Sequence, residues 1–312
     1  MSTGPLLPTE RVRRLAIVGP TAAGKSALAL AVARVRSDVE LVSVDSMQVY
    51  RGMDIGTAKP SASEQAGVPH HMIDLLDADQ RCAVGWFQAH AARAVDSIEQ
   101  RGSSVLYVGG TGLYHRAVVD GLEIPPEYPE IRSELEVELL DGTPVAELHG
   151  RLARLDPLAA SRTGLNDRRI IRALEVTLGS GRPFSSFGPG MAHYGETATL
   201  TIGLHLDRDD IGRLVERRVD RMLAAGLVEE VRRLERSPGF GTTAAEALGY
   251  KQIRAHLRGE LSLEAAREAI VTGTRRFAVR QERWFRRDPR IVWFPAKSPP
   301  SAAVLADTLR GP

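Results

Sequence analysis

Apolar residues fall into short continuous runs along the chain, and most of these runs are followed by a longer segment with helical periodicity. The runs lie at 15–18, 40–44, 104–108, 199–206 and 291–294, and each has the length of a buried strand. Strands that alternate with helices predict a parallel sheet with helices on both faces, which is the α/β class. Ligands of such sheets bind beyond the carboxyl ends of the strands, so polar residues there are the first candidates for a functional site.

The middle of the chain departs from this alternation. Three successive segments, 129–140, 144–155 and 167–178, have helical character with no strand-like run between them. We therefore expect a helical insertion within the α/β core. The expected divisions are a loose terminus at 1–10, the first half of the core at 11–122, the insertion at 123–197, the second half of the core at 198–296 and a loose terminus at 297–312.

Polar residues and glycines mark where several helices begin and end. Asn166 is the expected N-cap of the helix at 167–178, and Gly179 its expected end. In the second half of the core, Asp207 is expected to cap a helix that runs to Ala225. Further helices are expected at 228–236, 244–257 and 263–287.

The most specific motif joins the first strand to its helix. It reads Gly19-Pro20-Thr21-Ala22-Ala23-Gly24-Lys25-Ser26 and matches the phosphate-binding pattern Gly-x-x-x-x-Gly-Lys-Ser. Its glycines let backbone N–H groups point at an anion, and the helix N-terminus adds positive charge. Lys25 is expected to neutralise a terminal phosphate, and the Ser26 hydroxyl to help hold Mg²⁺. The alternative is a glycine-rich turn that binds nothing.

Composition and charge narrow the class of protein. The chain has 312 residues, a formal net charge of +2 and no apolar run of membrane-spanning length. Its only cysteine, Cys82, excludes an internal disulfide and a cysteine-based zinc site. With no secretory signal in view, we expect a cytoplasmic protein without membrane contact. The nearly balanced net charge leaves nucleic-acid binding to be judged from local clusters.

Asp45 ends the second strand, and a parallel sheet would bring it to the same edge as Lys25. There it could act as a general base, help to hold Mg²⁺, or merely cap the following turn. The strand at 104–108 ends in Gly109-Gly110, whereas hydrolytic phosphate-loop proteins need an acid at a strand end. The pattern therefore favours group transfer over hydrolysis.

The densest basic cluster lies on the helix expected at 263–287. Its members fall on one face at helical spacing: Arg276, Arg280, Arg283 and Arg287. A basic stripe suits a polyanion that lies along the helix. The same arginines could instead form a solvated face paired with Glu264, Glu268 and Glu282.

Two smaller arginine clusters lie on other helices. Arg168, Arg169 and Arg172 stand near the start of the last inserted helix, where anions are already favoured. One member of a further cluster, Arg217, Arg218 and Arg221, could bind a diphosphate through its planar fork. Basic clusters together with a phosphate loop favour a nucleic-acid partner.

Taken together, these features resemble the tRNA dimethylallyltransferase (tRNA isopentenyltransferase) family in its bacterial form. Besides the phosphate loop, the resemblance rests on motifs that span about residues 14–294. They are Asp45-Ser-Met-Gln-Val-Tyr50, Gly52-Met-Asp-Ile-Gly-Thr-Ala-Lys-Pro60, Pro69-His-His-Met-Ile-Asp74, Gly109-Gly-Thr-Gly-Leu-Tyr114, Asn166-Asp-Arg-Arg-Ile-Ile-Arg-Ala-Leu-Glu175, Gly249-Tyr-Lys-Gln252, Arg280-Gln281 and Trp284-Phe-Arg286.

The resemblance implies a P-loop NTPase-like core that binds dimethylallyl diphosphate and Mg²⁺. It implies transfer of the dimethylallyl group to the exocyclic N6 amine of the adenine 3′ of the anticodon, position 37, of tRNA. Asp45 matches the general base, 19–26 the diphosphate cradle, and Lys25 and Arg218 the groups that stabilise the leaving diphosphate. The expected tRNA contacts, from the resemblance and from the basic stripe, are Asp45, Ser46, Met47, Gln48, Thr111, Arg168, Arg169, Ile170, Ile171, Arg172, Arg276 and Arg280.

Other functions remain open at this point. A GTPase is excluded, because Asn166 is the only asparagine and the sequence after Lys59 lacks the guanine-reading pattern. A P-loop kinase or nucleotide switch would use Asp45 for Mg²⁺, and a non-catalytic RNA-binding protein would use only the basic clusters. The loop could also bind a nucleotide such as ATP. We expect a monomer that meets the anticodon stem-loop of tRNA.

Overall fold

The computed structural model describes residue 7 and residues 12–309 of the chain. It divides into two compact units. The core unit combines the chain up to Gly121 with the chain from Glu196 onward, and the helical unit is Leu122–Gly195. This division falls within two residues of the insertion expected at 123–197. Each unit is described separately below.

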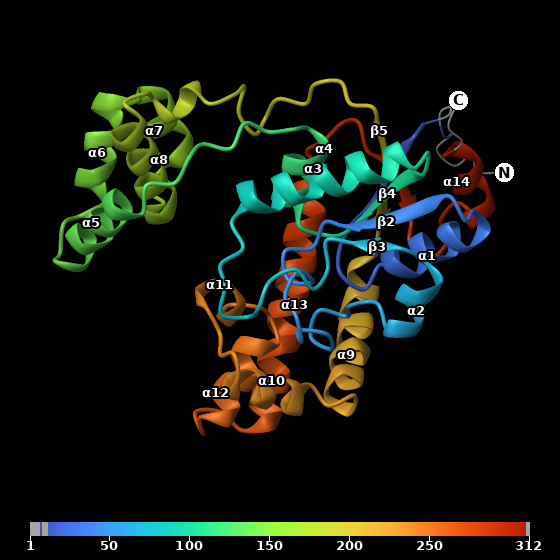
Figure 1. The fold of residues 1–312 in the computed structure, drawn as a ribbon. Helices are drawn as coiled ribbons and strands as arrows, with labels where there is room; N and C mark the ends of the chain where they lie inside the picture. The colour runs from blue at the N-terminus through green and yellow to red at the C-terminus, as the bar shows by residue number, and fades with distance from the viewer. Residues whose placement is uncertain (1–6, 8–11, 310–312) are drawn as a thin grey trace. The chain divides into compact units, whose positions relative to one another are not determined.

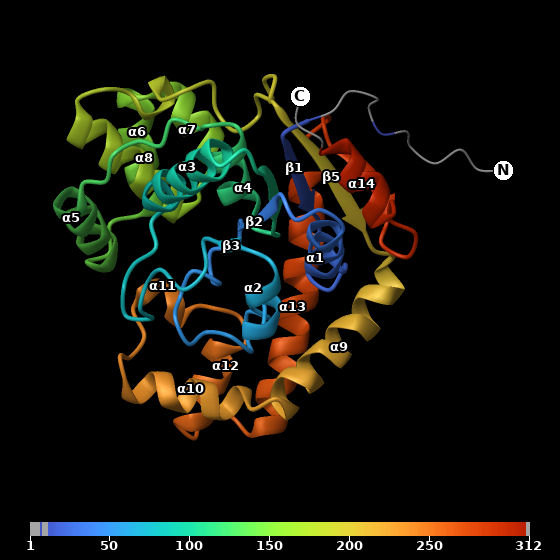
Figure 2. The same ribbon diagram turned by 45° about the vertical axis from the view of Figure 1, so that its right-hand side comes forward.

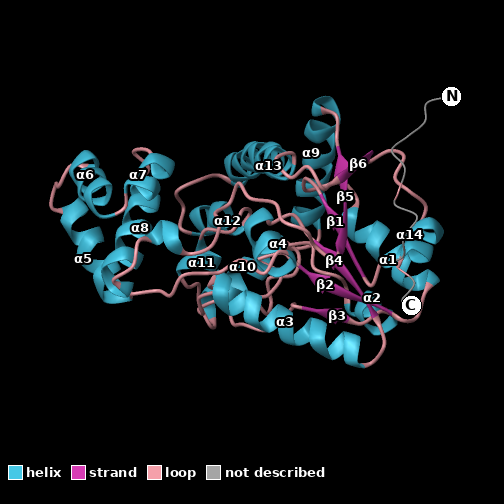
Figure 3. Cartoon of the chain, turned by 90° about the horizontal axis from the view of Figure 1, so that it is seen from above, coloured by secondary structure: helices cyan, strands magenta, loops and turns pink. Residues whose placement is uncertain are grey.

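A six-stranded sheet forms the centre of the core unit, in the order β3-β2-β4-β1-β5-β6 (Figures 1 and 3). Every neighbouring pair is parallel. The strands are β1 (Arg14–Val18), β2 (Val39–Ser43), β3 (His70–His71), β4 (Ser104–Val108), β5 (Thr199–His205) and β6 (Val292–Pro295). The predicted α/β class is therefore confirmed, with a P-loop-type arrangement in which the loop after β1 lies centrally.

Helices cover both faces of this sheet. In the view from above, α1 and α14 lie on one side of the strands and α3, α4 and α13 on the other (Figure 3). The helices of the core unit are α1 (Lys25–Val35), α2 (Ala62–Gly67), α3 (Val84–Gln100), α4 (Gly112–Val119), α9 (Arg208–Ala224), α10 (Leu227–Arg236), α11 (Thr242–Ala245), α12 (Tyr250–Leu257), α13 (Leu263–Phe285) and α14 (Ala302–Thr308).

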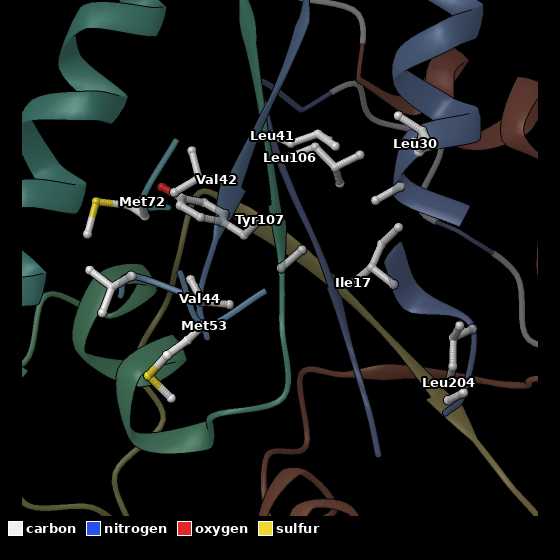
Figure 4. Close-up of a cluster of buried hydrophobic side chains, with 14 of the residues drawn as sticks. Ile17, Leu30, Leu41, Val42, Val44, Met53, Met72, Leu106, Tyr107 and Leu204 are labelled. Carbon is white, nitrogen blue, oxygen red and sulfur yellow. The ribbon is translucent and has the colours of Figure 1, made fainter. Parts of the chain in front are cut away.

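The sheet is buried on both faces because its side chains alternate between two apolar layers. In Figure 4, Leu30 of α1 lies beside Leu41 and Leu106, while Val42 and Tyr107, their neighbours in sequence, lie on the opposite side. All four strand residues are at most 2% exposed. This alternation explains why the strands read as continuous apolar runs.

Two expectations for the chain after residue 197 are wrong. The helix expected at 244–257 is divided into α11 and α12, because Gly249 has a φ of +92° and interrupts the helical path. The expected loose tail from 297 contains α14, whose buried Leu305 belongs to the main hydrophobic core. The terminus expected at 1–10 lies outside the described residues except for Leu7, which packs against that core.

The helical unit has a hydrophobic core of its own, formed among others by Leu135, Leu148, Leu152, Ile170 and Leu174. Figure 2 shows its four helices, drawn in green. They are α5 (Pro129–Leu140), α6 (Val145–Leu155), α7 (Pro157–Thr163) and α8 (Asp167–Ser180), followed by the short 3₁₀ helix η1 (Phe184–Ser186).

The boundaries of α8 test two sequence predictions. Asn166 is the N-cap, as predicted, and its side chain accepts the N–H of Arg169 at 3.1 Å. Gly179 is not the end of the helix, which continues to Ser180 and stops at Gly181, where φ is +68°. The sequence pattern also did not predict α7, which begins at Pro157.

Candidate active site

The phosphate loop leaves β1 and leads directly into α1. Gly19 is required by close packing, because a Cβ atom there would lie 2.3 Å from the carbonyl oxygen of Leu204. Gly24 has a φ of +82° and turns the chain into the helix. Among the described residues, nothing accepts the N–H groups of Gly24, Lys25 and Ser26. Free N–H groups at a helix start are the structural basis of an anion cradle.

Lys25 is held within this loop. Its Nζ donates to the carbonyl of Pro20 at 2.7 Å. Burial, together with the nearby Arg218 guanidinium, lowers the pKa of Lys25 to about 7, while the Asp45 carboxylate acts in the opposite direction. An anion bound at the loop would favour the charged form of Lys25 again.

Asp45 follows β2 and lies at the same edge of the sheet as Lys25, as the sequence predicted. Its carboxylate raises the pKa of both Lys25 and Arg218, so all three groups interact electrostatically. Oδ1 accepts the N–H of Met47 at 2.9 Å, so the capping role considered for Asp45 is real. Oδ2 has no hydrogen-bond partner within the described part of the chain.

Arg218 projects from α9 toward this cluster. Burial lowers the pKa of Arg218, and Asp45 partly compensates. In the described residues, no carboxylate lies within ion-pair distance of its guanidinium. A half-buried guanidinium without an ion pair is well suited to bind a diphosphate.

The loop after β4 connects these elements. Thr111 accepts the N–H of Ser46 through Oγ1 at 3.5 Å, which places Thr111 next to the Asp45 turn. Gln281 of α13 bonds both to Thr21 in the phosphate loop and to Gly110. From the sequence, Gln281 was noted only as part of the motif Arg280-Gln281 and was given no role, although a polar residue on the buried face of a helix could have indicated one.

The segment 48–60 is a rigid support rather than an open binding loop. Gln48 is only 9% exposed, and its carboxamide bonds to Ser43 and to the carbonyls of Thr57 and Ala58. These bonds already engage the Gln48 carboxamide, and the tRNA contact expected at Gln48 stays a prediction. Glu230 of α10, 3% exposed, accepts backbone N–H groups from residues 54–56 and fixes the far end of the segment.

The predicted tRNA contacts on α8 divide into exposed and buried residues. Arg168 and Arg169 are exposed. Ile170 and Ile171 are at most 5% exposed and pack in the core of the helical unit; a tRNA contact at these two positions stays a prediction. Arg172 donates to the carbonyls of Pro125 and Pro126 and to Glu175, and it serves the scaffold of this unit.

The basic stripe consists of Arg276, Arg280 and Arg283 on α13 and of Arg287, two residues beyond the end of that helix; all four are exposed. Within the described ranges, none of the four has an acidic side chain in ion-pair distance. The arginines of this helix that do form ion pairs lie off the stripe and are Arg267, Arg275 and Arg286. Glu282 pairs with Arg286, so it does not neutralise the stripe. This arrangement favours a polyanion over the paired, solvated face.

Residues that could serve other chemistry are accounted for. Burial raises the pKa of Cys82 to about 11, so its thiol stays protonated at neutral pH. No group of three or more His, Cys, Asp or Glu side chains in the described residues could hold a metal ion. None of the helices in that part of the chain combines the length and apolar character needed to cross a bilayer.

Comparisons with known proteins show which proteins this chain is similar to. The family model described as IPP transferase matches residues 48–288. A tRNA dimethylallyltransferase of Geobacter metallireducens is 49% identical over 295 residues, covering 92% of this chain and 94% of that protein. The solved tRNA isopentenylpyrophosphate transferase of Bacillus halodurans is 36% identical with a TM-score of 0.67, covering 95% of this chain and 97% of the other.

A eukaryotic dimethylallyltransferase acting on tRNA extends the likeness across a larger evolutionary distance. It has a TM-score of 0.75 at 25% identity and covers 91% of this chain and 73% of its own. The match to the family model covers most of the chain, and the bacterial relative is similar from end to end. This chain belongs to the IPP transferase family.

Proposed function

We propose that this protein is a tRNA prenyltransferase that moves the dimethylallyl group of dimethylallyl diphosphate to the N6 amine of the adenine 3′ of the anticodon. The observation that carries the proposal is the meeting of Asp45, Lys25 and Arg218 at a cradle of unpaired N–H groups, in a chain of this family. The cradle fits the diphosphate of the donor. The carboxylate supplies the base that the acceptor needs.

The proposed reaction forms a bond between N6 of adenine and C1 of the dimethylallyl group, while the bond from C1 to the diphosphate oxygen breaks. The lone pair of the exocyclic amine is delocalised into the ring, so the amine must lose a proton as it attacks. Oδ2 of Asp45 takes that proton. The diphosphate leaves with the bonding electron pair, and Lys25, Arg218 and the loop N–H groups stabilise its charge.

Mg²⁺ is the proposed metal cofactor. The donor set fits this ion, because Mg²⁺ takes few protein oxygens and relies on phosphate oxygens and water. The Ser26 hydroxyl, exposed on the first turn of α1, would hold the ion. When bound, Mg²⁺ would neutralise part of the charge on the diphosphate.

Exposed arginines in both units provide the proposed grip on tRNA. The stripe on α13 offers unpaired cations for phosphates, and Arg168 and Arg169 of the helical unit do the same. An adenine stacked in the anticodon loop must turn outward to reach a protein site, at a cost of a few kcal/mol. Contacts between these arginines and the RNA would offset that cost.

We further propose that the protein is a monomer, because one chain supplies the cradle, the base and the basic stripe. We also propose that it acts in the cytoplasm. The phosphate loop would contact the phosphates of a ligand and not the group attached to them, so ATP is expected to compete with dimethylallyl diphosphate for this site. A hollow beside Gly24, lined by Leu206, Leu214, Arg217 and Lys297, has room for the remainder of such a nucleotide.

A donor-competition experiment tests the proposal against its rivals. The protein is incubated with unmodified tRNA, labelled dimethylallyl diphosphate and labelled ATP together. We expect prenyl label to enter tRNA while ATP is unchanged. Phosphoryl transfer from ATP would identify a kinase, and tRNA binding without use of either donor would identify a non-catalytic RNA-binding protein.

A further inference from the structure

Gln281 is a buried polar side chain on a face of α13 that is otherwise apolar. It is 7% exposed and shares that face with Ala278 and Phe285. Both ends of its carboxamide are used. Oε1 accepts the N–H of Thr21 at 2.8 Å, and Nε2 donates to the carbonyl of Gly110 at 2.9 Å. The same amide therefore binds the phosphate loop and the loop after β4.

The Gln281 carboxamide is closely packed. A Cβ atom on Gly110 would lie 2.2 Å from Nε2 of Gln281, so a side chain there would displace the carboxamide. One helical turn further along α13, the indole ring of Trp284 occupies the corresponding space at Gly112, where a Cβ atom would lie 2.0 Å from Cδ1. The helix thus contacts the loop after β4 at two successive turns.

We propose that Gln281 is a positioning residue for the transfer reaction. Its two hydrogen bonds hold the phosphate loop in register with the loop after β4. That second loop carries Thr111, which bonds to the turn that contains Asp45. The diphosphate cradle and the base therefore share one support, with Gln281 at its centre. This proposal rests on the proposed prenyl transfer and deepens it, since it names the residue that sets the distance between donor and base.

The first test replaces Gln281 by methionine, which has a similar length and volume but cannot form either hydrogen bond. Without the two bonds, kcat/KM for dimethylallyl diphosphate is expected to fall by about tenfold to a hundredfold. KM for tRNA should change by less than about threefold, because Gln281 does not face the basic stripe. Gln65→Met is the matched control, since Gln65 also bonds to a backbone carbonyl, that of Pro60, but lies on α2.

The second test perturbs the same contact from its other side. Gly110→Ala should displace the carboxamide and reproduce the kinetic loss. Gln281→Ala with Gly110→Ala should be no worse than Gln281→Ala alone, because the shorter side chain leaves room for the new methyl group. Thermal unfolding of every variant separates loss of positioning from loss of fold.

The outcomes are distinguishable. Wild-type kinetic constants in Gln281→Met, or additive losses in the double variant, would overturn the positioning role. If the wild-type protein itself transfers no prenyl group, the proposed function fails first. The positioning role can then be tested by calorimetry with inorganic diphosphate. The affinity of Gln281→Met for this ligand should be at least about tenfold lower than that of wild type. Equal affinities would overturn the inference.

Discussion

Asp45 is the residue on which the proposed chemistry depends most. Asp45→Asn keeps an oxygen that can accept the Met47 N–H, so the turn should persist. It removes the base, and turnover is expected to fall by about 10² to 10⁴ while tRNA affinity stays nearly unchanged. Single-turnover rates and filter-binding affinities measure the two effects separately. Equal loss of both would show that Asp45 is a contact and not a base.

Lys25 predicts a pH dependence of diphosphate binding. The pKa of Lys25 in the free protein is lowered to about 7, and a bound diphosphate favours the charged form. Binding therefore takes up a proton above pH 7, so affinity should fall as pH rises through 7 and 8, by up to about tenfold per pH unit. Calorimetry with inorganic diphosphate at several pH values measures this slope.

The control for this prediction is Lys25→Arg, which remains charged over the whole range. The diphosphate also changes its protonation with pH, but it does so equally in both measurements, so this effect does not alter the difference between the two proteins. Above pH 7, the diphosphate affinity of the wild-type protein should fall more steeply with pH than that of the variant. The difference corresponds to at most one additional proton taken up on binding. Identical slopes would mean that Lys25 does not titrate in the site.

His115 makes a prediction about stability. It is 2% exposed, its Nδ1 has no hydrogen-bond partner among the residues that the structure describes, and burial lowers its pKa to about 4. The unfolded chain takes up the same proton near pH 6.5. The unfolded state thus binds more protons between pH 6.5 and 4, and the free energy of unfolding should fall over that interval by about 3 kcal/mol.

Urea unfolding at several pH values checks this prediction against His115→Gln, which cannot take the charge. Whatever the stability of the variant at neutral pH, its decrease between pH 6.5 and 4 should be smaller than that of wild type. The nearby Asp120 and Asp288 are present in both proteins, so their effect is common to both curves. Parallel stability curves would show that His115 contributes nothing to the pH dependence.

The positions of functional residues could be predicted where a motif also specifies the backbone conformation around them. The phosphate-loop pattern predicted the cradle and Lys25, and the end of a parallel strand predicted the place of Asp45. The burial of the Gln48, Ile170 and Ile171 side chains could not be predicted, because a linear motif does not show which of its side chains face inward. Burial decides that, and burial depends on elements far away in the sequence.

Among the helices and strands, α13 carries the clearest prediction. Arg276→Ala or Arg280→Ala should weaken tRNA binding and reduce its logarithmic salt slope by about 1 for each phosphate that the arginine neutralises. Arg267→Ala is the matched control, since Arg267 lies on the same helix but is paired with Asp220 at 2.6 Å. Filter binding across a salt series measures the slope. An unchanged slope in the stripe variants would return α13 to the solvated-face interpretation.

The strands and most helices could be predicted because their apolar runs and periodicity are local signals. The division of 244–257 into α11 and α12 could not, since Gly249 takes a positive φ only in its tertiary setting. The helix α14 was missed for a similar reason. Its buried Leu305 lies in a short segment with little apolar periodicity, and only packing against the core reveals it.

The molecule as a whole combines two separately packed units. The core unit contains the proposed cradle, the proposed base and the basic stripe, and the helical unit has its own hydrophobic core and its own exposed arginines. The shift in composition from Pro125 led us to expect an insertion at 123–197, and the helical unit of the structure is Leu122–Gly195. The chemistry follows from a single edge of the core sheet, where Asp45, Lys25 and Arg218 meet.

Mass analysis of tRNA nucleosides is the sharpest test of the proposed chemistry. Purified protein is incubated with unmodified tRNA, dimethylallyl diphosphate and Mg²⁺ without ATP, beside the same reaction with Asp45→Asn. We expect N6-dimethylallyladenosine at the position 3′ of the anticodon, one diphosphate released per modified base, and little product with the variant. Unmodified adenosine with the wild-type protein, or equal product from both proteins, would contradict the proposal.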